Sequence, residues 1–256
     1  MPRLFLPTPM SLCLLLAGPL SAQDPFEIQV YEYQTTPTGR WNLETHLNYT
    51  AKGTAEAEND VAPSEGQTHL TFELTRGITD VFELAGYLVL ASRTGARTDF
   101  AGWRIRPRVR APESWNLPVG LSLSMEVGFP TSDYEENSAT LEVRPIIEKV
   151  FGRVQVDLNP VIGRALSGPG TVDGWDLEPG GRLGLTTTDR LDLSVEYYAS
   201  LGSPSDLLPA DEQVHQFFFG GDYALAENII FNLGIGFGTT DVGNRLVYKS
   251  RLGWMF

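Results

Sequence analysis

The chain has 256 residues with a single cysteine, 26 glycines and 11% aromatic residues, and its 32 acidic residues outnumber the 19 basic ones. The resulting net charge of −13 argues against a nucleic-acid partner. No apolar run is long enough to cross a bilayer as a helix. The glycine and aromatic content, with repeated short runs of alternating character, favours an all-β fold.

Residues 1–22 have the pattern of a secretory signal peptide. Arg3 supplies a positive charge, Leu12 to Leu16 form a short apolar core, and Ala22 offers a small residue at the cleavage site. Cys13 lies inside this segment, so the mature chain has no cysteine, which excludes disulfides and cysteine-based chemistry. Without Arg3, 18 basic residues face 32 acidic ones, a net charge of about −14.

Residues 23–38 form a short lead-in to the rest of the chain. Polar and aromatic residues alternate with Ile28 and Val30, and Pro37 and Gly39 separate this stretch from the first long alternating run. The pattern is compatible with an extra short strand, a periplasmic tail or a plug inside a barrel.

Residues 39–256 contain twelve runs with the period-two alternation of β-strands. The clearest spans about eleven residues, the length that a tilted membrane strand needs; in it Leu121 and Leu123 face away from Ser122 and Ser124. The predicted strands cover residues 41–50, 67–76, 82–90, 103–111, 119–129, 141–148, 154–160, 177–186, 191–198, 217–223, 229–237 and 245–256.

The connections between these runs alternate in length. Short turns are predicted at 77–80, 112–116, 151–153, 187–190 and 225–228, and the other connections are mostly longer and often acidic. Short and long connections are not expected to alternate in this way in a soluble β-sandwich. The sequence therefore predicts a 12-stranded antiparallel up-and-down transmembrane β-barrel in the bacterial outer membrane, with both termini in the periplasm.

The last strand has aromatic and apolar residues on one face. Tyr248, Leu252, Trp254 and Phe256 are in phase, and this set resembles the C-terminal signal that the barrel-insertion machinery reads. We expect this strand to pair with the first one and close the barrel.

Charged residues alternate with apolar ones on several strands. Four arginines on one face of the run 103–111 would each cost about 2–4 kcal/mol at the midplane of a bilayer, so they must face water or the barrel interior. The predicted pore-lining residues are Arg104, Arg106, Arg108, Arg110, Glu126, Glu142, Arg144, Glu178, Arg182, Glu196, Lys249 and Arg251. Opposed basic and acidic walls can guide polar solutes through an open lumen. In a closed barrel the same residues would pair as salt bridges that fill the interior.

Four prolines fall in the middle of predicted strands: Pro107, Pro145, Pro160 and Pro179. Each removes a hydrogen bond from the ladder, so we expect bulges or bends there, concentrated on one side of the barrel.

The sequence predicts no enzyme active site and no cofactor or metal site. Of the three histidines, His46 is expected inside the barrel, and His69 and His215 at lipid-facing or strand-end positions. None has a serine and an acid placed as a hydrolase requires. The acidic loops lack the ligand spacing of a calcium-binding loop.

The overall plan resembles Gram-negative outer-membrane barrels over the whole mature chain. More narrowly, Gly39-Arg40-Trp41-Asn42-Leu43-Glu44 and Val156-Asp157-Leu158-Asn159-Pro160 resemble the outer-membrane transporters of the phenol-degradation meta pathway. This resemblance implies passive uptake of small aromatic or hydrophobic compounds. The lead-in of about fourteen residues differs from the N-terminal hatch of fatty-acid and aromatic transporters.

The interpretation from sequence is a monomeric outer-membrane channel for small solutes. Its expected partners are outer-membrane lipid and lipopolysaccharide, the barrel-insertion machinery and a small-molecule solute. The alternative is a non-conducting structural or adhesive barrel, with a lipid-modifying enzyme as the lesser alternative.

Overall fold

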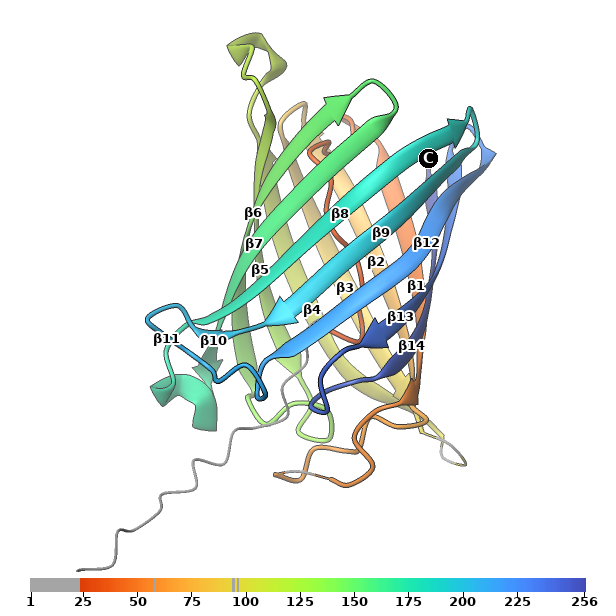
Figure 1. The fold of residues 1–256 in the computed structure, drawn as a ribbon. Helices are drawn as coiled ribbons and strands as arrows, with labels where there is room; N and C mark the ends of the chain where they lie inside the picture. The colour runs from red at the N-terminus through yellow and green to blue at the C-terminus, as the bar shows by residue number, and fades with distance from the viewer. Residues whose placement is uncertain (1–23, 58, 94, 96) are drawn as a thin grey trace, which may run out of the picture.

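A computed structural model describes residues 24–57, 59–93, 95 and 97–256. In this part of the chain, twelve antiparallel strands close into one barrel (Figure 1). The predicted all-β, 12-stranded barrel is confirmed. No helix among these residues has the length and apolar character to span a membrane. The predicted signal peptide, residues 1–22, lies outside the described residues.

Strands that are consecutive along the chain are neighbours around the barrel, and the last strand pairs with the first. The barrel strands are β1 (Trp41–Lys52), β2 (Thr68–Thr79), β3 (Phe82–Ser92), β4 (Thr98–Arg110), β5 (Gly120–Pro130), β6 (Ala139–Phe151), β7 (Val154–Ser167), β8 (Asp176–Thr188), β9 (Leu191–Ser200), β12 (Val214–Ala226), β13 (Ile229–Gly238) and β14 (Leu246–Met255). A small hairpin that the sequence did not predict lies between β9 and β12, formed by β10 (Gly202–Ser203) and β11 (Asp206–Leu207). Two 3-10 turns are η1 (Glu113–Trp115) and η2 (Pro169–Val172).

The two ends of the barrel differ in their connections. At the end that we call the turn end, the strands are joined by residues 80–81, 111–119, 152–153, 189–190 and 227–228. At the opposite loop end, they are joined by 53–67, 93–97, 131–138, 168–175, 201–213 and 239–245. Both β1 and β14 have their outer termini at the turn end, which in barrels of this type faces the periplasm (Figure 1).

The outer surface is apolar, as a lipid-facing barrel requires. On β5, Leu121 and Leu123 are exposed, whereas Ser122 and Ser124 between them are buried. Aromatic pairs lie near both ends: Trp103 stacks on Phe129 with ring centroids 4.3 Å apart near the loop end, and Trp254 packs on Phe256 at 4.6 Å at the turn end. Such aromatic belts mark the two membrane–water interfaces.

Deleting Phe256 is expected to impair barrel assembly. The backbone of Phe256 exchanges two hydrogen bonds with Trp41, of 2.8 and 2.9 Å, so the deletion removes the end of the seam between β14 and β1 as well as the ring that packs on Trp254. The measurement is the yield of heat-modifiable folded barrel on gels. The control is Phe151→Ala, which removes another exposed aromatic ring at the turn end without touching the seam. Equal yields from both variants would count against an assembly role.

The barrel interior is occupied by residues 24–38, which we call the inner segment. It runs from the loop end to the turn end and then enters β1 (Figure 1). The segment contains no strand, although most of its side chains are buried. Ile28 and Val30 pack against Tyr198, Phe218 and their neighbours, forming one apolar cluster. A second apolar cluster surrounds Phe26 with the Tyr87 ring and small residues of β3 and β4. Of the three sequence-based possibilities for the lead-in, this placement inside the barrel matches the plug.

The strand ladder is interrupted beside each of the four mid-strand prolines. The β4–β5 register passes from Ile105 to Arg108 without pairing Pro107, and the β6–β7 register skips the stretch that includes Pro145 and Pro160. Pro179 lies opposite Pro160 in the β7–β8 register but has no partner in the β8–β9 register, which begins at Gly180. The interruptions lie between β4 and β9, on one side of the barrel.

Candidate functional site: the barrel interior

Wall side chains bind the backbone of the inner segment along its length. We use "wall" for the inward-facing side chains of the barrel strands. The wall donors to carbonyl oxygens are Asn48 to Pro25 (2.9 Å), Lys249 to Ile28 (3.3 Å), Arg144 to Gln29 (3.2 Å), Arg108 to Glu32 and to Gln34, and Ser122 to Tyr33 (2.6 Å). The wall carboxylates of Glu148 and Glu83 accept from the amides of Tyr33 (2.8 Å) and Thr36 (2.6 Å). An extended peptide inside a barrel has no neighbouring strand to satisfy its backbone, so these side chains take that role.

A further wall side chain holds Tyr31 through two hydrogen bonds. Asn159 of β7 accepts from the Tyr31 amide at 2.7 Å and donates to the Tyr31 carbonyl at 3.0 Å. One side-chain amide thus reproduces both bonds of a strand pair. Asn159 lies in the stretch of β7 that is not paired with β6, beside Pro160.

The Tyr31 ring is surrounded by arginines. The guanidinium carbons of Arg144, Arg106 and Arg108 lie 4.3, 5.1 and 5.4 Å from the ring centroid, within the range of cation–π attraction. The Tyr31 hydroxyl donates to Glu27 and lies 3.0 Å from the hydroxyl of Tyr87. We call Glu27, Tyr31, Tyr87 and Arg144 the Tyr31 layer.

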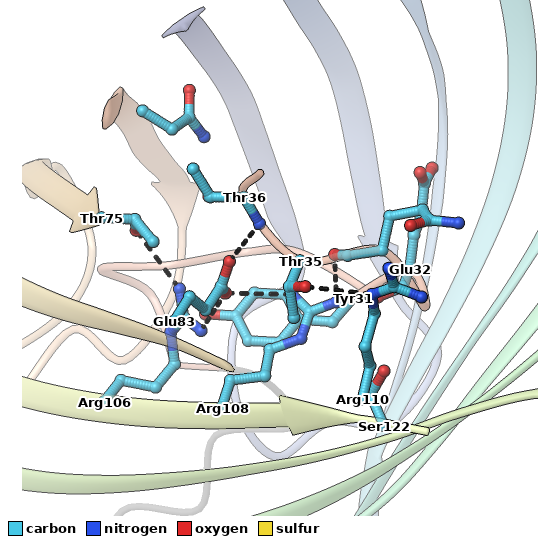
Figure 2. Close-up of polar contacts among 12 residues, drawn as sticks. Tyr31, Glu32, Thr35, Thr36, Thr75, Glu83, Arg106, Arg108, Arg110 and Ser122 are labelled. Atoms are coloured by element: carbon cyan, nitrogen blue, oxygen red, sulfur yellow. Dashed lines mark hydrogen bonds and ion pairs between the residues drawn. The ribbon is translucent and has the colours of Figure 1, made fainter. Parts of the chain in front are cut away.

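The arginines of β4 bind carboxylates and the inner segment together. Arg106 pairs with Glu73 and, at 2.8 Å, with Glu83, while Arg108 lies 3.6 Å from Glu83. Figure 2 shows Arg106, Arg108 and Arg110 in a row on the same strand, all directed toward the inner segment. Four charged residues are buried here: Arg106, Arg108, Glu73 and Glu83. Each buried charge is stabilised by its ion-pair partners, because water does not solvate it.

A second ion-pair network lies on the opposite side. Arg182 contacts Glu32 of the inner segment, Asp157 and Asp222, each at 3.2 Å. Arg251 joins Asp222 (3.2 Å) to Glu44 (3.3 Å). The Lys249 ammonium lies 2.5 Å from Glu196.

Two cavities flank the Tyr31 layer. The loop-end cavity has a volume of about 350 Å³ and its wall is mainly acidic. Its carboxylates are Asp24, Glu126, Glu135, Glu142, Asp176 and Glu178, against the guanidinium groups of Arg104 and Arg164. In the connection 131–138, burial raises the pKa of Glu135, because desolvation disfavours the charged form.

The turn-end cavity has a volume of about 500 Å³ and contains both signs of charge in similar number. Its basic residues are Arg40, Arg106, Arg108, Arg182, Lys249 and Arg251, and its acidic residues include Glu32, Glu44, Glu83 and Asp222. Tyr31 itself lines this cavity, whereas Glu27, Tyr87 and Arg144 line neither. Residues 24–26 line the loop-end cavity and residues 28–32 the turn-end cavity, so the Tyr31 layer lies where the two cavities approach each other.

The structure places the twelve predicted pore-lining residues on the inner face of the barrel. Four of them line the loop-end cavity: Arg104, Glu126, Glu142 and Glu178. Six line the turn-end cavity: Arg106, Arg108, Arg182, Glu196, Lys249 and Arg251. Arg110 and Arg144 line neither cavity; both contact the inner segment, through Thr35 and Tyr33 for Arg110 and through Gln29 for Arg144.

Some important interior residues were absent from the predicted set. Glu44, Glu73 and Asp222 complete the ion-pair networks, and Asn159 fixes the inner segment. Strand alternation alone could have found Glu73, because it lies between the outward-facing Phe72 and Leu74. The alternation gives no sign that wall residues bind a peptide.

One expectation about the histidines is wrong. His69 is buried inside the barrel, where it bonds to Gln67 at 2.8 Å and packs edge-on against Phe26. It alternates with the outward-facing Leu70, so it takes the inward phase of β2. His46 is inside as expected, and His215 stacks on Tyr197 with its ring nitrogen 2.7 Å from the Tyr197 hydroxyl.

Two glycines make room for the inner segment. A Cβ at Gly77 would overlap the carbonyl oxygens of Thr36 and Pro37, where the segment leaves the barrel at the turn end. A Cβ at Gly120 would lie within 3.0 Å of the Tyr33 ring. Any larger residue at either position must displace the segment.

No protein-family model matches the chain, and no curated protein matches its sequence. Among solved structures, it is similar to an outer membrane channel from Pseudomonas putida F1, with a TM-score of 0.57 and 12% identity over 90% of this chain and 100% of that chain. The NanC porin aligns with a TM-score of 0.55 and 8% identity over 84% and 98% of the two chains. The KdgM porin in complex with disordered oligogalacturonate aligns with a TM-score of 0.52 and 10% identity over 85% and 99%.

At such low identities the likeness shows a shared fold. The closed barrel, its apolar outer surface and its two aromatic belts, together with that fold, place the protein in the bacterial outer membrane. The narrower resemblance to phenol-degradation transporters stays a prediction.

Proposed function

We propose that the protein is an outer-membrane channel for small polar solutes, which the inner segment closes in this conformation. The observation on which the proposal rests is the pair of charged cavities, one toward each end of the barrel, with the Tyr31 layer where they approach each other. A barrel that served only as a structural element would have no need of cavities of about 350 and 500 Å³ in line with its axis. The predicted pore-lining residues would then contact solute once the segment moves.

Movement of the segment is the step that this proposal requires. The segment is attached mainly through hydrogen bonds and ion pairs, and water or a polar solute can replace these one by one. Its apolar contacts are limited to Phe26, Ile28, Val30 and the tyrosine rings. Recording from purified protein in planar bilayers tests the proposal directly. Conductance steps are expected, and a complete lack of conductance would favour the non-conducting barrel.

The loop-end cavity is expected to make the channel prefer cations. Six carboxylates line it against two arginines, and rings of acidic side chains select for cations. Substituting Glu142→Gln and Glu178→Gln together should therefore shift the reversal potential, measured in a KCl gradient, toward that of a non-selective pore.

Asp211→Asn/Glu212→Gln is the matched control for this measurement. It also removes two charges, but from exposed positions in the connection 201–213, none of whose residues lines the loop-end cavity. A reversal potential that the Glu142→Gln/Glu178→Gln variant leaves unchanged would show that ions do not pass the loop-end cavity.

A further inference from the structure

Three buried side chains from different parts of the chain meet beside the Tyr31 layer. They are Glu27 of the inner segment, His46 of β1 and Glu73 of β2, and their potential ligand atoms all lie within 4.8 Å of one another. The Nε2 atom of His46 is 3.9 Å from an oxygen of Glu73. His46 is only 1% exposed, and within the described residues its Nε2 atom has no hydrogen-bond partner.

A fourth carboxylate lies next to His46. Glu44 lies directly opposite Glu73 in the β1–β2 register, and one of its oxygens is 3.5 Å from His46 Nε2. Two carboxylates directly opposite on neighbouring strands repel each other. Arg106 binds Oε1 of Glu73, and Oε2 of the same carboxylate is the atom nearer His46. In Glu44, one oxygen lies both 3.3 Å from Arg251 and 3.5 Å from His46 Nε2.

The donor set suits a transition-metal ion. Zn²⁺ takes four nitrogen and oxygen ligands at about 2.0–2.2 Å, which places neighbouring ligand atoms of a tetrahedron about 3.4 Å apart. The separations of 3.5 and 3.9 Å from His46 Nε2 are close to that spacing. The atoms of Glu27, His46 and Glu73, which lie within 4.8 Å of one another, must move closer together to bind one ion. The imidazole distinguishes the site from those of Mg²⁺ and Ca²⁺, which take oxygen ligands.

We propose that Glu27, His46 and Glu73 bind one Zn²⁺ ion, with Glu44 as the fourth ligand. Three of the four ligands belong to the wall and one to the inner segment, so the ion joins the two. Zinc therefore stabilises the closed position of the segment, a consequence that rests on the proposed channel function. The sequence predicted no metal site, because Glu27, His46 and Glu73 are far apart along the chain and the four residues match no short metal-binding motif.

Zinc binding is measured on the full chain in detergent, by competition with a chromophoric chelator. One ion per chain is expected, and Co²⁺ in place of Zn²⁺ should give the visible absorption of a tetrahedral site with a nitrogen ligand. His46→Ala should abolish binding, and Glu27→Gln should weaken it at least tenfold.

His69→Ala is the control, because it removes an equally buried histidine of the same wall that lies outside the cluster. Heat modifiability on gels confirms that every variant is folded. Lack of zinc binding by the wild-type chain would overturn the proposal and leave His46 as a partner of Glu44. Equal loss of binding in His46→Ala and His69→Ala, or none in Glu27→Gln, would overturn it too.

The effect on the inner segment has a separate readout. Zinc should lower the conductance of the wild-type protein, and Glu27→Gln should conduct equally well with and without zinc. Zinc binding without an effect on conductance would overturn the closing role of the ion. Zinc binding by a protein that never conducts would support the site and contradict the proposed function instead.

Discussion

A Val30→Cys/Gly180→Cys variant is expected to conduct only after reduction. Val30 belongs to the inner segment and Gly180 to β8, and a Cβ at Gly180 would lie 3.7 Å from a methyl carbon of Val30. This proximity is compatible with a disulfide after small shifts. Because residues 23–256 contain no cysteine, the engineered pair has no competing thiol once the predicted signal peptide is removed. With the bond formed, the segment cannot leave the barrel, and conductance in planar bilayers should fall to that of protein-free membranes.

Each single-cysteine variant, under the same oxidising conditions, is the control for this experiment. Both should conduct as the wild-type protein does, and adding a reductant should restore conductance to the double variant alone. If the oxidised double variant conducts normally, solutes pass the segment where it lies, and movement is not required.

Asn159→Asp is expected to have the opposite effect. The substitution keeps the size of the side chain but replaces the group that donates to the Tyr31 carbonyl with a carboxylate oxygen. Losing that bond, with one carbonyl left facing an anion, costs the docked state about 2 kcal/mol, which is roughly a 30-fold shift in population. Channel openings should therefore become more frequent, and single-channel recording counts them.

Gln216→Glu is the matched control for Asn159→Asp. It also converts a buried amide that donates to a carbonyl into a carboxylate, but the carbonyl belongs to Asn244 in a connection at the loop end (2.6 Å). Its opening frequency should stay near that of the wild-type protein. A similar rise in opening frequency in both variants would mean that the substitutions destabilise the barrel in general. It would contradict a specific role of Asn159 in holding the inner segment.

Most of the fold could be predicted from sequence, because lipid imposes a simple rule. Every strand that crosses the membrane must alternate between apolar and polar faces, so the twelve runs and their number follow from the pattern. The ends of the strands were less accessible: β4 begins at Thr98, five residues before its predicted start, and β10 and β11 are two residues long. Loops and strand ends lie in water or among lipid headgroups, so their residues need not alternate between apolar and polar.

The interior was predictable in part. The inward direction of Arg106, Lys249 and the other charged residues follows from the cost of placing them in lipid. Their partners follow only in part: Asp157 is the cross-strand neighbour of Arg182 in the β7–β8 register, whereas Asp222 lies on β12, two strands away. The lead-in left three possibilities open, since an isolated extended peptide has the same local pattern in a strand, a tail or a plug.

The joint between the inner segment and β1 determines where an open channel would place the segment. The two run in opposite directions and meet at Gly39, which has a φ of +80° at the turn end. A segment that swings out about this joint emerges into the periplasm, with its backbone groups no longer held by the wall. An extended peptide with free amides and carbonyls is what sheet edges of other proteins bind. If the channel opens by this route, the amides and carbonyls of residues 24–38 become exposed on the periplasmic side.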